Sequence, residues 1–460
     1  MGIVGLPNVG KSTFFNILCK MNVAAENYPF CTIDPNLSRV VVPDERFDFL
    51  VSAFKTKSAI PAVLTVTDIA GLVKGAAEGA GLGNAFLSHI GAVDGIYHVC
   101  RAFESDDIVH VEGSVEPTRD LDIIHNELRK KDMAALASKM EPLRKQAERG
   151  GAANKEAKET FTMLSKFWAW LEEGKDIRLG DWSPAEVEEL NTHMFLSAKP
   201  VIYLVNMSEK AYIAKKSKFL PALGDWLKAR GTDDKMIPFS CEFEGKVRKR
   251  RRGSGGGGRR RRRREKAPRA GASAAPKPSP PPLFAQLAGM SEAEAAAYCE
   301  SVGAKSALPR IIKTGYSALG LVHYFTASAN EVRAWSVKKD TPAPKAAAVI
   351  HGDFEKHFIS SDIYTFADFK ELGSEANVRA AGKLRAEGRK YEVQDGDSAC
   401  GGARAARAQR GPAQSSRKLR SSPAPFRPFV DSLLLEGRVL TPLSSVVISS
   451  SVVMVGGRMS

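Results

Sequence analysis

The segment from Gly5 to Ser12 (GLPNVGKS) has the residue types and spacing of a phosphate-binding loop. It follows the apolar pair Ile3 and Val4 and opens a segment with helical apolar spacing. Glycines let backbone N–H groups surround phosphate oxygens, and a helix start adds partial positive charge. Lys11 would reach the β- and γ-phosphates, and the Ser12 hydroxyl would bind Mg²⁺. The alternative is an ordinary glycine turn. The predicted nucleotide contacts here are Asn8, Val9, Gly10, Lys11, Ser12 and Thr13.

Two later segments offer further groups for a metal–phosphate site. Asp68 ends the apolar run 63–68 and begins the sequence Asp-Ile-Ala-Gly. A carboxylate at a strand end commonly supports Mg²⁺, and the Gly71 amide would lie near the γ-phosphate. Thr32 is the natural candidate for a second hydroxyl on the metal, and a plain loop threonine is the alternative. We therefore predict Ser12, Thr32 and Asp68 as metal ligands, with Lys11 and Gly71 among the catalytic groups.

The residues Asn206 to Glu209 (NMSE) follow a second apolar run, 200–206, where they would meet the nucleotide base. Guanine-specific relatives carry Asn-Lys-x-Asp there, and the aspartate accepts hydrogen bonds from guanine N1 and N2. Glu209 is longer than aspartate, and Met207 replaces the lysine whose stem flanks the base. We predict that Asn206, Met207 and Glu209 contact the base and that guanine selectivity is lost, which leaves open whether adenine is preferred.

These groups need a scaffold that brings the ends of several strands together. Apolar runs at 3–4, 63–68, 95–100, 200–206 and 236–240 alternate with segments of helical spacing. Such alternation predicts an α/β fold with a mostly parallel sheet that is covered on both faces.

A different pattern separates the two halves of that fold. Apolar residues recur at three- and four-residue steps over 121–143 and again over 161–171, on either side of Gly150 and Gly151. This pattern predicts two antiparallel helices, a helical lobe inserted into the sheet domain. A short helix is expected near 291–299, and 305–397 reads as a small α+β domain.

Charge is distributed unevenly along the 460 residues, whose formal net charge is +15. Residues 246–270 carry 14 basic side chains and one acidic one, and 398–460 carry nine basic and two acidic ones. The remainder is mildly acidic. Six widely spaced cysteines without a CxxC pair argue against a disulfide scaffold or a thiolate zinc site. The apolar stretch 439–457 contains Pro442 and several serines, so we expect no stable membrane association.

Several motifs together resemble the Obg-like ATPase (YchF) family over about 1–245 and 284–397. They are GLPNVGKST, YPFCTIDPN, DIAGLVKGAAEGAGLGNAFL, NMSE, EVRAW and IHGDFEKHFI. The resemblance implies a P-loop NTPase domain, an inserted helical coiled-coil lobe and a C-terminal β-grasp (TGS) domain. It also implies a preference for ATP over GTP, a link to ribosomes and translation, and a TGS-like domain that binds RNA, ribosome or a protein partner.

The same resemblance bears on the mechanism. Leu72 stands where many GTPases place a water-orienting glutamine, and a leucine cannot polarise water. His110 matches the histidine proposed for that role in the family, and a surface histidine at the base of the lobe is the alternative. Asn8 matches an asparagine that binds K⁺ in related enzymes. The alternative is that Asn8 stabilises the turn of the loop and binds no cation.

The expected domain organisation follows from these patterns. The P-loop NTPase domain comprises 1–103 and 186–245, the helical lobe 104–185, a disordered basic linker 246–283, a connecting helix 284–303, the TGS-like domain 304–397, and an atypical, disordered tail 398–460.

The linker and the tail depart from the family pattern. After Asp397 the family continues into an apolar closing strand, whereas residues 398–402 read Ser-Ala-Cys-Gly-Gly. We therefore expect a β-grasp sheet without its last strand, and the TGS-like domain as the least stable folded part. Either an error in the gene model or a basic extension accounts for both segments. An extension this basic would bind nucleic acid or an acidic membrane surface, or act as a nuclear import signal.

Taken together, the sequence predicts a cytoplasmic, Mg²⁺-dependent P-loop ATPase that acts as a slow switch, with a nuclear pool if the linker is genuine. Two alternatives remain open: a GTPase or an NTPase with little base preference, and a nucleotide-gated ribosome- or RNA-binding protein whose hydrolysis is incidental.

Overall fold

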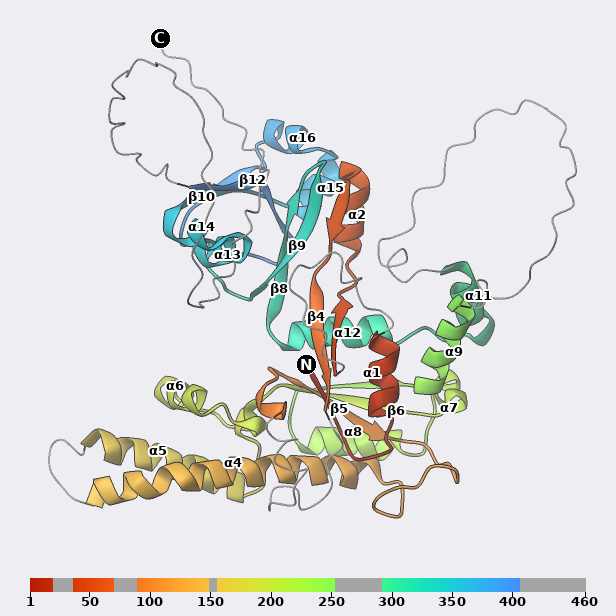
Figure 1. Ribbon diagram of the computed structural model, residues 1–460, viewed down its shortest axis with the longest axis vertical. Helices are drawn as coiled ribbons and strands as arrows, with labels where there is room; N and C mark the ends of the chain where they lie inside the picture. Colours follow the sequence, from red (N-terminus) through yellow and green to blue (C-terminus); the bar gives the residue numbers. More distant parts are fainter. Residues whose placement is uncertain (20–35, 70–88, 149–154, 253–291, 406–460) are drawn as a thin grey trace, which may run out of the picture. The chain divides into compact units, whose positions relative to one another are not determined.

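The N-terminal part of the chain folds around a six-stranded sheet in the order β2-β4-β1-β5-β6-β7 (Figure 1). The computed structural model describes residues 1–19, 36–69, 89–148, 155–252 and 292–405. β2 runs antiparallel to β4, and the other neighbours are parallel. Every residue of β5 and β6 is buried, as expected for strands covered on both faces. The strands are β1 (Gly2–Val4), β2 (Leu37–Val41), β4 (Val63–Asp68), β5 (Ile96–Arg101), β6 (Val201–Asn206) and β7 (Lys235–Phe239). The predicted mostly parallel sheet is confirmed.

Helices follow most of these strands and bury their apolar stripes against the sheet. In α1, Phe14, Phe15 and Leu18 are buried, which agrees with the helical spacing in the sequence. Asp44 caps α2 by accepting a hydrogen bond from the backbone N–H of Arg46. The helices of this part are α1 (Lys11–Cys19), α2 (Glu45–Phe54), α7 (Glu209–Ala214), α8 (Leu220–Ala229) and α9 (Cys241–Arg252). α9 therefore runs into the range that the sequence analysis assigns to the basic linker.

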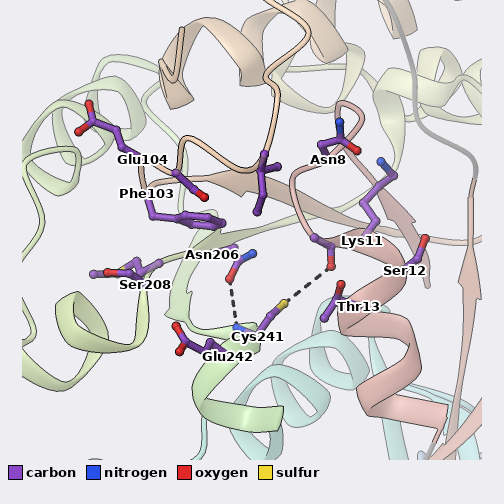
Figure 2. Close-up of a pocket in the computed structure, with 14 residues that line it drawn as sticks. Asn8, Lys11, Ser12, Thr13, Phe103, Glu104, Asn206, Ser208, Cys241 and Glu242 are labelled. Carbon is purple, nitrogen blue, oxygen red and sulfur yellow. Dashed lines mark hydrogen bonds between the residues drawn. The ribbon is translucent and has the colours of Figure 1, made fainter. Parts of the chain in front are cut away.

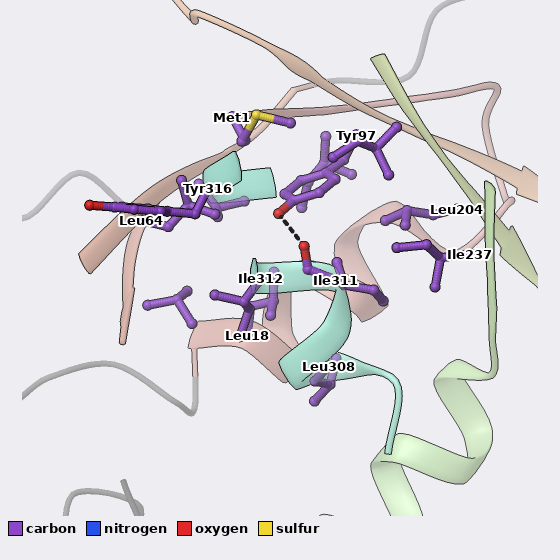
Figure 3. Close-up of a cluster of buried hydrophobic side chains, with 14 of the residues drawn as sticks. Met1, Leu18, Leu64, Tyr97, Leu204, Ile237, Leu308, Ile311, Ile312 and Tyr316 are labelled. Carbon is purple, nitrogen blue, oxygen red and sulfur yellow. Dashed lines mark hydrogen bonds between the residues drawn. The ribbon is translucent and has the colours of Figure 1, made fainter. Parts of the chain in front are cut away.

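A later helix, α12 (Leu308–Ala318), completes the core of the N-terminal sheet. Its buried residues Ile311 and Ile312 pack among side chains from β4, β5 and β6 (Figure 3). The Tyr97 hydroxyl donates a 2.9 Å hydrogen bond to the Ile311 carbonyl. A Cβ at position 315 would lie 1.8 Å from that hydroxyl, so Gly315 permits the close approach. α12 lies in the range assigned to the TGS-like domain, yet it packs on the NTPase sheet.

The helical lobe is an antiparallel pair, α4 (Pro117–Glu148) and α5 (Lys155–Glu172) (Figure 1). Leu136, Leu164 and Phe167 form its fully buried centre. The same cluster includes Leu190 of α6 (Pro184–His193) and Phe195, so the core of the lobe extends past residue 185. None of the helices in the described ranges is long and apolar enough to cross a membrane.

A buried ionic cluster fixes the base of the lobe to the sheet domain. Asp176, whose side chain is 1% exposed, precedes the 3₁₀ turn η4 (Ile177–Leu179). Its carboxylate lies 2.9 Å from His125 Nδ1 and 2.7 Å from Arg129 Nη1, both on α4, and 2.5 Å from Arg230 Nη2 after α8. Burial acts to raise the pKa of Asp176, but the hydrogen bond from His125 and the arginine charges outweigh burial and hold the pKa well below its usual range.

The C-terminal part contains a second six-stranded sheet in the order β11-β10-β12-β8-β9-β3. Its outermost strand β3 comes from the N-terminal part and pairs in parallel with β9, Ser58 opposite Glu331. The strands are β3 (Ser58–Ile60), β8 (Leu321–Ala327), β9 (Glu331–Lys338), β10 (Phe358–Thr365), β11 (Arg385–Glu387) and β12 (Asp397–Ala405). The helices are α11 (Glu292–Val302), α13 (Ala343–Ile350), α14 (Gly352–His357), α15 (Phe366–Leu372) and α16 (Glu375–Ala380).

The closing strand is present, so the expectation of a sheet without it is wrong, as is disorder for residues 398–405. β12 lies between β10 and β8, antiparallel to the first and parallel to the second. Ser398 is fully buried, and Ala399 borders a small void together with Ala343, Ala346 and Ala347 of α13. Backbone pairing with two neighbouring strands compensates for the weak strand propensity of residues 398–402. The expectation that the TGS-like domain is the least stable folded part rested on a missing last strand, so this finding removes the basis for it. Residues 406–460 lie outside the described ranges.

We expect Asp176→Asn to destabilise the protein by about 3–5 kcal/mol at pH 7, because buried arginines would lose their counter-charge. The folded-state pKa of Asp176 is depressed, so its stabilisation is complete above the unfolded pKa of about 3.9 and is lost as pH falls further. The difference between wild type and variant should therefore shrink below about pH 4. Urea unfolding across pH checks this, with exposed Asp181→Asn as the control. A pH-independent difference would contradict it.

Ending the chain after Gly396 should unfold the C-terminal sheet, whereas ending it after Arg407 should not. The first truncation removes β12 from between β8 and β10 and leaves both ladders open. Hydrogen exchange would show lost protection in β8 and β10 with β5 and β6 still protected. Equal protection in the two truncated chains would mean that β12 is dispensable.

Candidate nucleotide-binding site

The loop between β1 and α1 has a backbone that only certain residues tolerate. Gly10 has φ +104°, and a Cβ there would lie 2.5 Å from Asn206 Nδ2. Asn8 also lies in the left-handed region, with φ 61°. The backbone N–H of Phe14 donates to the Gly10 carbonyl at 2.9 Å, which starts the helix. The first N–H groups of α1 have no acceptor within the helix and can bind phosphate oxygens.

Asn206, at the end of β6, joins this loop to the start of α9. Its Nδ2 donates to the Val9 carbonyl at 3.0 Å, and its Oδ1 accepts from the backbone N–H of Cys241 at 3.1 Å. Asn206 is 3% exposed. Both the nitrogen and the oxygen of the amide therefore bind the protein. We call this pair of hydrogen bonds, which holds the phosphate-binding loop against the start of α9, the Asn206 clamp.

A cavity of about 700 Å³ lies along these segments (Figure 2). Gly10, Lys11, Ser12 and Thr13 line one end. In Figure 2, Phe103 and Ser208 lie at the opposite end, and Asn206 lies between the two groups. The cavity thus has a phosphate end and an end suited to a nucleoside.

Lys11 lines the phosphate end, and Asp68, which is not among the lining residues, lies beside Lys11 and Ser12. Lys11 is 6% exposed, and its Nζ donates to the Leu6 carbonyl at 2.7 Å. Burial lowers the pKa of Lys11 to about 8, against the charge of Asp68. Burial raises the pKa of Asp68, opposed by a hydrogen bond from Ser12 and the charge of Lys11. The structure thus brings together three residues that the sequence predicts.

The donor groups present suit Mg²⁺. Asp68 Oδ1 is buried and has no hydrogen-bond partner among the described residues, and the Ser12 hydroxyl lies beside the same carboxylate. Carboxylate and hydroxyl oxygens are the ligands that this hard cation prefers. Thr32 and Gly71, the other predicted groups of this end, lie outside the described residues.

Two of the three predicted base contacts, Asn206 and Met207, are among the residues that line the cavity, and Met207 is 2% exposed. Glu209 is not among the lining residues: its carboxylate pairs with Lys246 and accepts a 2.7 Å hydrogen bond from the Tyr298 hydroxyl. Glu242, on α9, lines the cavity instead and accepts a 2.7 Å hydrogen bond from the same Lys246. Sequence reasoning missed Glu242, although it closely follows the apolar run 236–240.

His110 is buried rather than on the surface. It is 8% exposed and lies outside the residues that line the cavity. Nδ1 accepts a hydrogen bond from the backbone N–H of Glu112 at 3.2 Å, so Nε2 carries the proton that is donated to Asp120 at 2.9 Å. Its neighbour Val109 accepts a 3.1 Å hydrogen bond from Asn8 Nδ2. The loop before α4 thus contacts the phosphate-binding loop through Asn8, one of the predicted nucleotide contacts.

Comparison with known proteins gives two family matches. A model described as a 50S ribosome-binding GTPase matches residues 1–139. A second model, named for the C-terminal part of YchF GTPases and described as a protein of unknown function, matches residues 321–400.

Whole-chain similarities are extensive. Obg-like ATPase 1 of Oryza sativa subsp. japonica is 49% identical over 397 residues, which cover 86% of this chain and 90% of the rice protein. The Gallus gallus and Homo sapiens proteins of that name are 50% and 49% identical over 399 residues, with the same coverage. The solved structure of the Schizosaccharomyces pombe YchF GTPase matches with a TM-score of 0.72 and 44% identity, covering 86% of this chain and 96% of that one.

We expect Asn206→Ala to lower the affinity for ATP and GTP by similar factors of at least about tenfold, since the clamp holds the loop that binds phosphates. The buried groups left unpaired should cost about 1–3 kcal/mol of unfolding free energy. Asn206→Asp keeps an acceptor for Cys241 N–H but has no donor for Val9, so it should fall between. Calorimetric titrations check this. A change confined to one nucleotide would instead indicate a base contact.

Proposed function

The chain belongs to the Obg-like ATPase (YchF) family of P-loop NTPases, and on this basis we propose that it hydrolyses ATP in preference to GTP. The observation that carries the proposal is the position of Glu209. This residue occupies the place of the guanine-binding aspartate, but its carboxylate is engaged by Lys246 and Tyr298 outside the cavity lining. Guanine N1 and N2 therefore lose the acceptor that selects them, whereas ATP needs no such group.

One observation favours the alternative, a GTPase or an NTPase with little base preference. The Glu242 carboxylate lines the same cavity, and a carboxylate can accept from guanine N1 and N2 as well as from adenine N6. Lys246 already donates to Glu242, which weighs against a second strong partner.

In the proposed reaction the phosphate end binds and positions the triphosphate. The 8–13 backbone N–H groups and Lys11 would hold the phosphates, with Gly71 near the γ-phosphate. Ser12 and Thr32 would hold Mg²⁺, and Asp68 would support it, in part through water. The metal, when bound, offsets charge on the β- and γ-phosphate oxygens. Met207 remains the proposed contact for the base, whereas the Asn206 amide holds the phosphate-binding loop and Glu209 is no longer proposed as a base contact.

His110 remains our candidate for orienting the attacking water. Asp120 fixes the ring through Nε2, which leaves Nδ1 as the acceptor nitrogen. To orient water, Nδ1 would give up its hydrogen bond from the Glu112 N–H and accept one from water instead. This change would be confined to the loop around His110, which Asn8 connects to the phosphate-binding loop. Asn8 is likewise the proposed ligand for K⁺, whose charge would do what an arginine finger does elsewhere.

We further propose that the ATPase is a slow cytoplasmic switch that acts on the ribosome, with RNA contacts through the TGS-like domain and the basic linker. Support comes from the family model described as a ribosome-binding GTPase over residues 1–139. β4 carries Asp68, and β3, which shortly precedes β4, pairs with β9 of the C-terminal sheet. That pairing offers a route from nucleotide state to the partner-binding domain. A His110→Ala variant that hydrolyses poorly yet still supports function would favour the nucleotide-gated binding alternative.

Paired calorimetric titrations with ATP and GTP, each with Mg²⁺, test the base preference. We expect ATP to bind at least tenfold more tightly, a difference of about 1.4 kcal/mol. Glu242→Ala is the matched variant, because it removes the α9 carboxylate that lines the cavity. Tighter GTP binding that is lost in Glu242→Ala would assign the protein as a GTPase with Glu242 as its guanine acceptor.

A further inference from the structure

We propose that Arg101 is a positioning residue that builds the nucleoside-side wall of the cavity. This wall is the segment 103–108, which supplies Phe103, Glu104, Ser105 and Ile108 to the cavity lining. The inference rests on the proposed function only in that a nucleotide occupies the cavity. It does not depend on which base is preferred.

The guanidinium of Arg101 organises the wall through three main-chain carbonyls. Nε donates to Phe103 at 2.9 Å, Nη1 to Ile108 at 3.0 Å and Nη2 to Ser105 at 3.3 Å. The planar guanidinium presents these donors in a fixed fork, so the three carbonyls are held in one relative arrangement. A flexible ammonium group could not reproduce that arrangement. Arg101 thus shapes the whole turn rather than one contact.

Burying the Arg101 guanidinium costs folding free energy, so a contribution to stability does not by itself account for an arginine here. Arg101 is the last residue of β5 and is 1% exposed. No carboxylate in the described part of the chain forms an ion pair with it, and burial lowers the pKa of its guanidinium, with Asp120 acting in the opposite direction. A buried cation that is held by carbonyl dipoles costs desolvation energy that an apolar side chain would not. The geometry points to a role in placing residues 103–108.

The wall is fixed at both ends. Arg101 holds its start, with its guanidinium carbon 4.8 Å from the centre of the Phe103 ring. Just past its end, the Val109 carbonyl accepts the hydrogen bond from Asn8 of the phosphate-binding loop. Arg101 therefore sets the shape of the wall, and the hydrogen bond between Asn8 and Val109 ties the end of the wall to the phosphate-binding loop.

Phe103 shows which part of a ligand depends on this wall. Its ring lines the cavity at the end remote from Lys11 and Ser12 (Figure 2). An aromatic face at this position can stack on a base of either kind, and stacking contributes about 1–3 kcal/mol per base. A ligand without a nucleoside would contact only the phosphate end. Arg101 should therefore matter for nucleotides and not for inorganic tripolyphosphate.

The test compares ATP, GTP and inorganic tripolyphosphate, each with Mg²⁺, by calorimetric titration of the full chain. Arg101→Met should weaken both nucleotides by at least about tenfold and change tripolyphosphate affinity by less than about threefold. Arg101→Lys should lie between, since it keeps the charge but not the fork. Arg178→Met is the control, because the Arg178 side chain is also largely enclosed, 11% exposed, but donates to Asp234 and Tyr203, which lie outside segment 103–108. The control should leave the ratio of nucleotide to tripolyphosphate affinity unchanged.

Equal loss for all three ligands, or no loss for any, would overturn the positioning role. If Arg101→Met does not fold, hydrogen exchange on Arg101→Lys decides instead. The inference requires faster exchange over 103–109 with β5 and β6 still protected, and unchanged exchange there contradicts it. Wild-type protein that binds ATP, GTP and tripolyphosphate equally would also overturn it. Tighter GTP than ATP binding would refute only the proposed base preference.

Discussion

At the end of β6, the side chain of Asn206 holds the phosphate-binding loop and the start of α9 through one donated and one accepted hydrogen bond. The loop can accept this contact because Gly10 has no Cβ where Asn206 Nδ2 lies. The carboxyl ends of β1, β6 and β7 meet at one edge of the sheet, so this side-chain amide ties the loop after β1 to the start of α9 after β7. The shape of the nucleotide cavity depends on that connection.

Buried charged side chains hold segments without regular secondary structure in place. Asp176 forms ion pairs with arginines on α4 and after α8, and Arg101 donates hydrogen bonds to main-chain carbonyls of the loop after β5. Apolar contacts are non-directional and could not fix a loop that lacks a helix or strand ladder. Charge-assisted hydrogen bonds are directional, and a low-dielectric interior strengthens them. In both cases the ionic group lies where regular structure ends.

The phosphate end was predictable from sequence because its residues are contiguous and their chemistry is local: the loop, Lys11, Ser12 and Asp68 lie where expected. The position of Glu209 was not, since its direction is set by Lys246 and Tyr298, which come from distant segments. Arg101 left only a weak signal, a charge at the end of an apolar run. β12 was missed for a related reason: its pairing is decided by the strands on either side and not by its own residues.

The place of β12 in the C-terminal sheet also sets the order in which that sheet can form during synthesis. β8, β9, β10 and β11 leave the ribosome before the strand that lies between β8 and β10. Until then the nascent chain can form only two separate ladders, β3-β9-β8 and β10-β11, whose inner edges are unpaired. Such edges are sites for wrong pairing with other nascent chains. A chaperone that shields β8 and β10 would act in the interval before residues 397–405 emerge.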